Sequence, residues 1–370
     1  MKIGVPREIK TQEYRVGLTP ESVAELVRAG HQVVVETNAG VGSGAPDAHY
    51  QKVGAKILPD AASVFAEAEL IVKVKEPQPV ECAMLKPHHT LFTYLHLAAD
   101  KPQAEALMKS GATCIAYETV TNRAGRLPLL QPMSQVAGRM SVFVGANALM
   151  RTRRGRGLLL GGVPGVPAAN VVILGGGVSG THAAEMAIGC RANVTVFDRS
   201  MPRLEELDVQ FAGAVDTVYA TQAAIDAAVV QADLVIGAVL VPGVSAPKLV
   251  TRAILKEMKP GAVLVDIAID QGGCFETSRP TTHDDPIYEV DGILHYCVAN
   301  MPGAVPRTST YALNNVTLPF TLDIASKGTK AALKADLYLA EGLNVAEGKI
   351  AYEGVANDLE LPFAKPAWLK

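Results

Sequence analysis

The segment VVILGGGVSGTHAAEMAIGCRANVTVFD, residues 171–198, constrains the fold of this chain more than any other stretch. An apolar run, Val171–Leu174, leads into Gly175, Gly177 and Gly180 in the spacing GxGxxG, and a helix-forming segment follows. In this setting the glycines permit a tight turn, close approach of a phosphate to the main chain, and close packing of helix on strand. The segment therefore predicts a βαβ unit whose helix N-terminus binds the pyrophosphate of a dinucleotide.

A second strand is expected at Asn193–Phe197 and ends at Asp198, 23 residues after Gly175. A carboxylate at this place accepts hydrogen bonds from the adenosine ribose and repels the 2′-phosphate of NADP. NAD is therefore the expected cofactor. Arg199 and Arg203 keep NADP open as an alternative, because a nearby arginine can accept that phosphate.

Short apolar runs alternate with helix-forming segments along most of the chain, which favours parallel sheets covered by helices. In the first 120 residues strands are expected at Lys2–Val5, Val33–Glu36, Leu70–Val74, Thr90–Tyr94 and Thr113–Tyr117, with helices at Thr19–Gly30 and Lys101–Lys109. A long helix is expected at Ser134–Met150, followed by strands at Val171–Leu174, Asn193–Phe197, Leu234–Ala238, Val263–Ile267 and Ile293–Val298. The chain after Arg307 is expected to be helical, including Lys330–Glu341, with no evident sheet.

A tail without its own core must pack on another part of the chain. The predicted fold class is therefore α/β with two Rossmann-like domains. A doubly wound NAD-binding domain, residues 129–306, is inserted into a discontinuous substrate-binding domain made of residues 1–128 and 307–370.

Composition excludes several classes of protein. The net charge of −3 lacks the basic excess of a general polyanion binder. The run RTRRGRG is either a nucleic-acid patch or the solvated end of the preceding helix, and the absence of interleaved aromatic residues favours the second. Five scattered cysteines without a CxxC pair indicate reduced thiols. The uncharged stretch 157–184 contains Pro164, Pro167 and several glycines, so a membrane helix is not expected. The N-terminus lacks the apolar core of a signal peptide, and a soluble cytoplasmic protein is expected.

Polar residues just after predicted strands are the candidates for a reactive site, since a dinucleotide fold does not by itself define a substrate. Asp270, His96 and Lys75 each hold such a place, and Arg15 lies in a loop where it could clamp a carboxylate. Each has a structural alternative, such as a turn carboxylate, a core histidine or a solvated arginine. The other histidines show no paired ligand spacing, so no metal site is expected.

Longer motifs resemble a known family. The chain contains MKIGVPREIKTQEYRVGLTP, VKVKEP, LFTYLHLA, LLQPMSQVAGRMS, GGVPGVPAANVVILGGGVSG, DIAIDQGGCFETSRPTTHDDP, CVANMPGAVPRTST and LNNVTLPF. These stretches closely resemble the bacterial alanine dehydrogenases of the alanine dehydrogenase and transhydrogenase α-subunit family, and the likeness covers essentially the whole chain.

The resemblance implies reversible, NAD-dependent oxidative deamination of L-alanine to pyruvate and ammonium. It implies that Arg15 and Lys75 bind the substrate carboxylate and carbonyl oxygen. It also implies that His96 is the general acid/base and that Asp270 is the second catalytic residue. We expect His96 and Asp270 to face each other across a cleft, one from each domain.

The resemblance also implies a homohexamer, with no nucleic acid and no membrane as partners. Ala220 departs from the family, whose members commonly carry a hydroxyl residue there. The residues implied to contact the cofactor are Ser134, Gly175, Gly177, Val178, Ser179, Gly180, Asp198, Arg203, Val239, Leu240, Ile267, Ala268, Ile269, Asp270, Arg279, Val298, Ala299, Asn300 and Met301.

Two other functions remain open on the residues alone. A transhydrogenase-type nucleotide subunit would move hydride between dinucleotides without an amino acid. A non-catalytic NAD-sensing or RNA-binding protein would bind NADH without turnover and show salt-sensitive affinity for nucleic acid.

Overall fold

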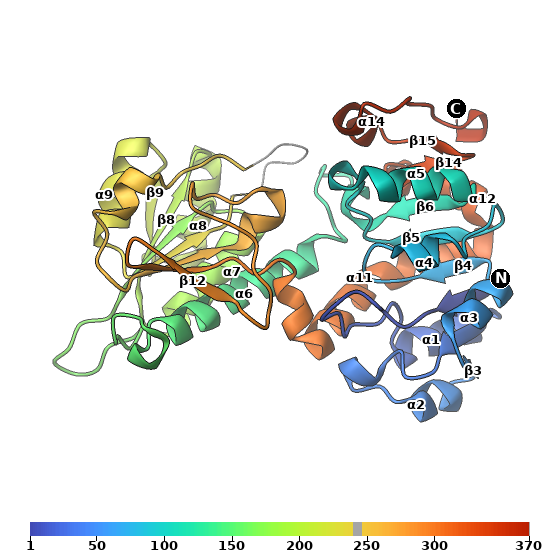
Figure 1. Ribbon diagram of the computed structural model, residues 1–370, viewed down its shortest axis with the longest axis horizontal. Coiled ribbons are helices and arrows are strands. Elements are labelled where there is room, and N and C mark those ends of the chain that lie inside the picture. Colours follow the sequence, from blue (N-terminus) through green and yellow to red (C-terminus); the bar gives the residue numbers. More distant parts are fainter. Residues whose placement is uncertain (240–245, 370) are drawn as a thin grey trace. The chain divides into compact units, whose positions relative to one another are not determined.

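The structure of the protein is a computed structural model that describes residues 1–239 and 246–369. The chain forms two compact units (Figure 1). The first consists of Met1–Met133 and Gly303–Lys370, and the second of Ser134–Pro302. Each unit is a sheet covered by helices, which confirms the predicted α/β fold class with two Rossmann-like domains.

The first unit is built on an eight-stranded sheet in the order β15-β14-β6-β5-β4-β1-β2-β3. Strands β1 to β6 run parallel, and β14 and β15 continue the sheet antiparallel. The strands are β1 Lys2–Val5, β2 Gln32–Glu36, β3 Lys56–Leu58, β4 Leu70–Val72, β5 Thr90–Thr93, β6 Thr113–Ala116, β14 Leu343–Ala346 and β15 Lys349–Ile350. The strand order reverses between β1 and β4, where a ligand crevice is expected in doubly wound sheets.

The helices of the first unit flank this sheet (Figure 1). They are α1 Pro20–Arg28, α2 Asp47–Lys52, α3 Ala61–Glu67, α4 Pro79–Cys82, α5 Lys101–Ser110, α11 Pro306–Lys327, α12 Thr329–Ala335, α13 Leu337–Ala340 and α14 Glu353–Leu359. Helix α6, Gln131–Ala148, begins in this unit and continues into the second.

The expectation that the tail after Arg307 has no sheet was wrong. Strands β14 and β15, drawn in red beside teal β6 in Figure 1, extend the N-terminal sheet, with Leu343 opposite Ile115. All four residues of β14 are buried. Such short apolar runs carry too little periodicity to be told from a helix. The helix expected at Lys330–Glu341 is also divided, because Asp336 is extended and caps α13 with its carboxylate.

The second unit is built on a seven-stranded sheet in the order β12-β13-β11-β10-β7-β8-β9. Among the described strands of this sheet, only β12 runs antiparallel to its neighbour. The strands are β7 Asn170–Leu174, β8 Asn193–Asp198, β9 Asp216–Tyr219, β10 Leu234–Gly237, β11 Val263–Asp266, β12 Ile287–Val290 and β13 Ile293–Tyr296. Besides α6, the helices are α7 Val178–Gly189, α8 Met201–Phe211, α9 Gln222–Gln231 and α10 Arg252–Leu255.

The central strands β10 and β11 have no exposed residue, as expected for a sheet covered on both faces. Strands β3, β9 and β12 lie at or near sheet edges and were not predicted. The expected strand Val263–Ile267 ends one residue early, at Asp266, whose carboxylate is fully buried.

No helix within the described residues is long and apolar enough to cross a membrane. None of the five cysteines, all of which lie in the described part of the chain, forms a disulfide. The arginine run follows the end of α6. In it Arg154 pairs with Glu289 and Arg156 with Asp233.

Candidate dinucleotide and substrate sites

The predicted cofactor residues of the second unit gather at one edge of its sheet. Apart from Ser134 on α6 and Arg203 on α8, those described lie in the turn after β7 and the first turn of α7, at the end of β8, directly after β10, β11 or β13, or in the loop from β11 to β12. Parallel strands present their carboxyl ends at a common edge, where dinucleotides bind in such folds. Leu240, which the resemblance also implies, lies outside the described residues.

The glycine turn is shaped by two close approaches. A Cβ on Gly180 would lie 1.8 Å from the carbonyl oxygen of Gly175, so α7 packs on its strand only because that Cβ is missing. Gly175 has φ of 103°, and its own Cβ would meet the carbonyl oxygen of Ala238 at 2.8 Å. A Cβ on Gly177, the residue that precedes α7, would meet nothing within 4 Å. The turn thus leaves open space beside Gly177 at the N-terminus of α7.

Asp198 and Arg203 brace this turn. The Asp198 carboxylate accepts the N–H of Gly176 at 2.8 Å and the N–H of Ser200 at 2.8 Å. Arg203 donates from Nε to the carbonyl oxygen of Gly176 at 2.7 Å and from Nη2 to Thr181 Oγ1 at 2.6 Å. Arg203 is therefore engaged with the turn and with Glu206, to which its third nitrogen donates.

Helix α6 approaches the same turn. A Cβ on Gly138 would lie 2.1 Å from the carbonyl oxygen of Ser179. Ser134 precedes Gly138 by one helical turn and so shares its face of α6. The structure therefore places Ser134 on the side of α6 that meets the glycine turn.

The loop that carries Asp270 is held by a neighbouring carboxylate. Asp266 ends β11, and its carboxylate accepts the N–H of Ala268 at 3.1 Å, the N–H of Cys274 at 2.8 Å and the hydroxyl of Ser278 at 2.5 Å. Burial raises the pKa of Asp266, and these hydrogen bonds oppose the shift. Asp270 itself lies in a short 3-10 turn, Ile267–Gln271, which Asp266 caps by accepting the N–H of Ala268.

The remaining predicted cofactor residues have well-packed surroundings. The guanidinium of Arg279 lies 4.1 Å from the ring centre of Tyr288, and the Tyr288 hydroxyl accepts the Arg279 N–H at 2.8 Å. Val298 and Met301 are buried in the core of the unit. Asn300 has a left-handed backbone, with φ of 68°.

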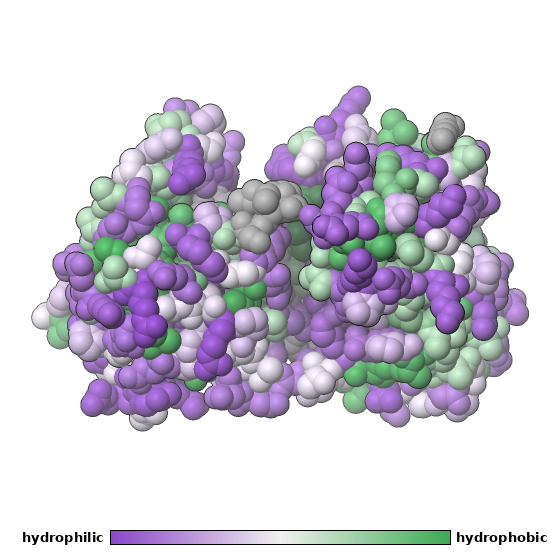
Figure 2. Space-filling model, turned by 45° about the horizontal axis from the view of Figure 1, so that its top comes forward, coloured by the Kyte–Doolittle hydropathy of each residue, from purple (hydrophilic) through white to green (hydrophobic). Residues whose placement is uncertain are grey.

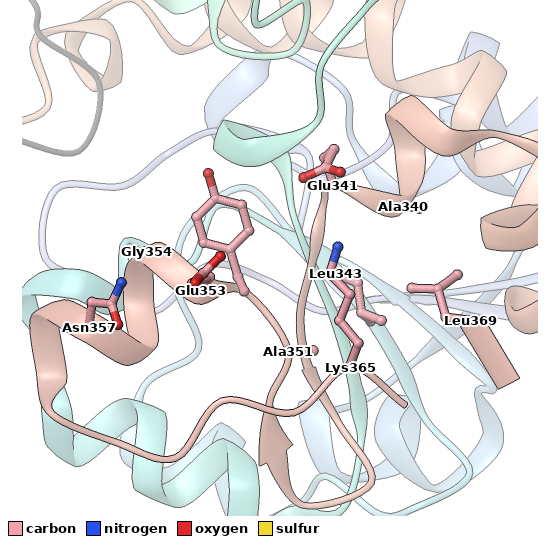
Figure 3. Close-up of a pocket in the computed structure, with 10 residues that line it drawn as sticks. Ala340, Glu341, Leu343, Ala351, Glu353, Gly354, Asn357, Lys365 and Leu369 are labelled. Carbon is pink, nitrogen blue, oxygen red and sulfur yellow. The ribbon is translucent and has the colours of Figure 1, made fainter. Parts of the chain in front are cut away.

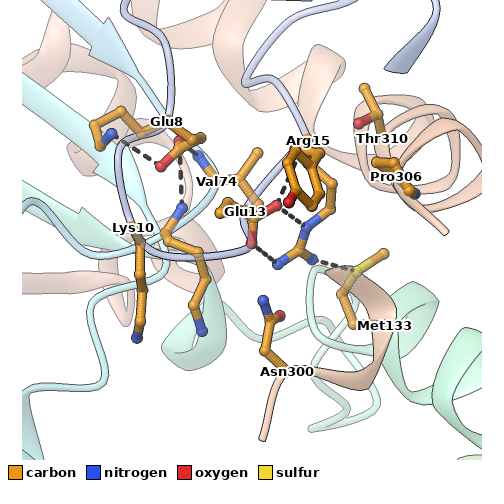
Figure 4. A network of polar contacts seen from close by, with 12 residues as sticks. Glu8, Lys10, Glu13, Arg15, Val74, Met133, Asn300, Pro306 and Thr310 are labelled. Carbon is orange, nitrogen blue, oxygen red and sulfur yellow. Dashed lines mark hydrogen bonds and ion pairs between the residues drawn. The ribbon is translucent and has the colours of Figure 1, made fainter. Parts of the chain in front are cut away.

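Arg15 lies in a buried ion pair in the first unit (Figure 4). Its Nε and Nη2 donate to the two carboxylate oxygens of Glu13 at 2.7 and 2.6 Å, and Nη1 contacts the Met133 sulfur at 3.1 Å. Burial lowers the pKa of Arg15, but the hydrogen bonds and charge of Glu13 outweigh it and raise the pKa overall. The alternative of a solvated surface arginine is excluded, because the residue is 2% exposed.

A second buried carboxylate fixes the segment that leads to Lys75. Glu8, which follows β1, accepts the N–H of Val74 at 2.7 Å and that of Lys75 at 3.4 Å (Figure 4). The ammonium of Lys73 pairs with Glu8 at 3.0 Å and with Glu81 at 2.7 Å. This network joins the loops after β1 and β4, the two strands between which the strand order reverses.

Lys75 lies beside Glu76, with Nζ 3.6 Å from a carboxylate oxygen that has no hydrogen-bond partner within the described chain. Glu76 also pairs with Lys10. Burial raises the pKa of Glu76, but the charges of Lys75, Lys10 and His96 outweigh it, and the pKa is lowered. Electrostatics therefore connects Lys75 and His96 through one carboxylate.

His96 follows β5 and has a strained backbone, with φ of 51° and ψ of 38°. Its ring stacks on Tyr94 at a centroid distance of 5.7 Å. Its N–H donates to Glu118 at 2.6 Å. The side chain is exposed, so the alternative of a core histidine is wrong. Thr93 links the strand end to Lys75, since its hydroxyl donates to the Lys75 carbonyl oxygen at 2.9 Å.

The structure thus brings Arg15, Lys75 and His96 to one sheet edge in the first unit, while Asp270 belongs to the second unit. A cavity of about 360 Å³ in the first unit contains none of them (Figure 3). It is lined from α13, β14 and α14 and includes Glu341, Glu353 and Lys365.

The carboxylates that hold these residues were not predicted from the sequence; they are Glu8, Glu13, Glu118 and Asp266. Asp266 was hidden because it was counted within an apolar run. Glu13 lies two residues from Arg15, and that short spacing was a usable signal. Glu8 and Glu118 act on segments 66–67 and 22–23 residues away, so no local pattern marks them.

Comparison with known proteins agrees with this architecture. Residues 4–137 match the family model for the N-terminal domain of alanine dehydrogenase/PNT, and residues 141–353 match the model for its C-terminal domain. The chain is 57% identical to an alanine dehydrogenase from Halomonas elongata over 369 residues, covering all of both chains.

Solved structures give the same result. A structure described as L-alanine dehydrogenase superposes with a TM-score of 0.94 at 52% identity, covering 97% of this chain and 99% of that one. A transhydrogenase from Sinorhizobium meliloti superposes with a TM-score of 0.81 at 26% identity, covering 95% and 99%. With both domain models matched in order along the chain, this protein belongs to the alanine dehydrogenase/PNT family, as its motifs predicted.

Proposed function

We propose that the protein is an NAD-dependent alanine dehydrogenase that interconverts L-alanine with pyruvate and ammonium. The observation that carries this proposal is the 57% identity to an alanine dehydrogenase over the full length of both chains. The sheet edge of the first unit supports it, because Arg15, Lys75 and His96 supply there the groups that a small amino acid requires. We assign substrate binding to residues 1–128 and 307–370 and NAD binding to residues 129–306.

The residues of the second unit fit a dinucleotide. The absent Cβ at Gly177 leaves room for a pyrophosphate at the N-terminus of α7, and the helix dipole favours its negative charge. Asp198 at the end of β8 suits the adenosine ribose, and its charge disfavours a 2′-phosphate. Arg203 already donates hydrogen bonds to the glycine turn and to Glu206, which supports NAD over NADP as the cofactor. When bound, the nicotinamide supplies the hydride acceptor.

Arg15 and Lys75 would hold the substrate. Glu13 orients the Arg15 guanidinium by accepting hydrogen bonds from its Nε and Nη2, and Arg15 would bind the substrate carboxylate by charge-assisted hydrogen bonds. The ammonium of Lys75 would face the carbonyl oxygen of pyruvate and stabilise the negative charge that develops on it.

His96 and Asp270 would move the protons. The amine of alanine must lose a proton before Cα can be oxidised, and water must lose one as it attacks the resulting iminium carbon. His96, exposed at its sheet edge, suits both transfers. Asp270 would act near the amine from the second unit. Two catalytic groups on two units would make domain closure a condition of turnover.

The test is a panel of small L-amino acids and 2-oxo acids, the latter with ammonium, followed by NADH absorbance. Turnover confined to alanine and pyruvate is the expected result, and no turnover with alanine would refute the assignment. His96→Ala and Asp270→Asn should each lose most of kcat while NADH still binds. Hydride exchange between dinucleotides without alanine would instead favour a transhydrogenase-type subunit, the alternative suggested by the Sinorhizobium meliloti structure.

We further propose a homohexamer. Large apolar side chains are exposed on α6 and in the segment between α6 and β7, including Phe143 at 58%, Leu159 at 65% and Val166 at 57%. The face shown in Figure 2 mixes hydrophilic and hydrophobic side chains. Light scattering on a size-exclusion column gives the mass, and a monomer would refute this assembly.

We also propose that the protein works in a reducing compartment such as the cytoplasm, because its five cysteines, all in the described part of the chain, form no disulfide.

A further inference from the structure

A single carboxylate holds the main chain on which His96 is mounted. Glu118 follows β6, the strand next to β5, and its Oε1 accepts the N–H of His96 at 2.6 Å. The same carboxylate accepts the preceding N–H, that of Leu95, at 3.1 and 3.2 Å. Two consecutive amide groups therefore converge on one side chain.

This contact accompanies an unusual backbone. His96 has φ of 51° and ψ of 38°, the left-handed region that residues with a Cβ seldom adopt. Strained conformations of this kind persist where the surroundings fix them. The residues around it do so: the carbonyl oxygen of Leu95 accepts from Gln103 at 3.0 Å, and the ring of His96 stacks on buried Tyr94.

The ring direction of His96 depends on that backbone. In the extended conformation of a continuing strand, its Cα–Cβ bond would point to a different side of the sheet edge. The Glu118 carboxylate accepts hydrogen bonds from both amides. A charged acceptor makes such bonds stronger than a neutral one does. It does not contact the imidazole through any hydrogen bond of its own.

We propose that Glu118 is a positioning residue for His96, setting the direction of the imidazole through the amides of Leu95 and His96. This inference rests on the proposed function, in which His96 handles protons. The glutamate acts through the backbone, so its effect should fall on kcat rather than on cofactor or substrate affinity.

The variant is Glu118→Gln, which keeps the size of the side chain and removes its charge. We expect kcat for L-alanine to fall by about 10- to 100-fold, the scale of a misplacement of catalytic groups by up to 1 Å. The KM for alanine and the Kd for NADH should change less than about threefold. The midpoint of thermal unfolding should stay near that of the unaltered protein.

Asp100→Asn is the matched control. Asp100 belongs to the same loop and accepts a backbone N–H, that of Gln103 at 3.0 Å, but it caps α5 and makes no contact with the amide of His96. This variant should keep its kcat. An equal loss of kcat in both variants would show a general loosening of the loop and overturn the proposal.

Hydrogen exchange followed by mass spectrometry gives a readout without turnover. In the full-length protein, Glu118→Gln should speed exchange in peptides that contain Leu95 and His96, whereas Asp100→Asn should speed it at the start of α5. Unchanged exchange near His96 would refute the contact. Faster exchange with unaltered kcat would refute the positioning role. A loss of NADH affinity as large as the loss of kcat would also refute it. Failure of the unaltered protein to oxidise alanine would refute the proposed function instead.

Discussion

The carboxylate of Asp266 accepts the N–H of Cys274 at 2.8 Å, and this bond closes the loop that carries Asp270. The same carboxylate accepts from Ala268 and Ser278, so every partner is a donor. The loop therefore requires an acceptor with two charged oxygens at the end of β11.

We predict that Asp266→Asn lowers kcat by about 100-fold, because an amide would turn an N–H₂ group toward one of these donors and displace Asp270. Steady-state kinetics with alanine and NAD measure the loss. Ser278→Ala removes one donor and keeps the carboxylate, so it should have a much smaller effect. Equal kinetics in Asp266→Asn and the unaltered protein would contradict the anchoring role.

The two glycines of the turn should respond differently to alanine. At Gly180 a Cβ would lie 1.8 Å from the Gly175 carbonyl oxygen, so Gly180→Ala should cost about 1–3 kcal/mol of unfolding free energy. At Gly177 it would meet nothing within 4 Å, so Gly177→Ala should leave stability unchanged. It should nonetheless weaken NADH binding by about tenfold or more, because the methyl group occupies the place proposed for the pyrophosphate. Thermal unfolding and NADH fluorescence titration separate the two effects. Unaltered NADH affinity in Gly177→Ala would place the cofactor elsewhere.

Lys73 is fully buried between Glu8 and Glu81, at 3.0 and 2.7 Å. Lys73→Met would leave two carboxylates buried together without a cation, so we expect a loss of about 3–5 kcal/mol of unfolding free energy. Lys56→Met is the control. It breaks the exposed pair with Glu67 and should cost less than about 1 kcal/mol. Guanidinium unfolding followed by circular dichroism compares the two variants. Similar losses of unfolding free energy in both would show that burial of the ion pair does not decide the size of the loss.

His295 makes stability depend on pH. Burial lowers its pKa from 6.5 to about 4, and the ring bonds Thr277 and the carbonyl oxygen of Ile293 at 2.7 and 3.0 Å. Between these pKa values the unfolded chain binds a proton that the folded chain does not. The contribution of His295 to the free energy of unfolding is therefore fully present above pH 6.5. It falls by up to about 3 kcal/mol as the pH drops to 4.

We predict that His295→Gln flattens this dependence between pH 6.5 and 4. Denaturant midpoints measured across that range give the slope for each variant. The exposed His49, changed to glutamine, should leave the slope as it is. An unchanged slope in His295→Gln would show that other groups cause the acid sensitivity.

A common arrangement connects the residues proposed for the chemistry. Arg15, Lys75 and His96 each have a main-chain N–H bound by a carboxylate, from Glu13, Glu8 and Glu118 respectively. Asp270 has its loop bound in the same way by Asp266. The strand ends carry these residues to the sheet edge, and the carboxylates fix the direction in which they leave it.

The sequence alone determined the parts of this protein that are local in the chain. The turn from Gly175 to Gly180, its flanking strands and Asp198 lie within one βαβ segment, so their spacing carried the prediction. The alternation of strands and helices likewise gave the α/β class, and the places of His96 and Lys75 after strands followed from it.

Only the tertiary structure decided which distant segments meet. Strand β14, which consists of four buried residues in the tail, joins the N-terminal sheet beside β6. Glu118, which follows β6, accepts the amide N–H of His96. Both contacts depend on the order of strands in a sheet. Backbone hydrogen bonds between strands are alike for every residue, so the packing of the whole unit, and no short pattern, selects the neighbours.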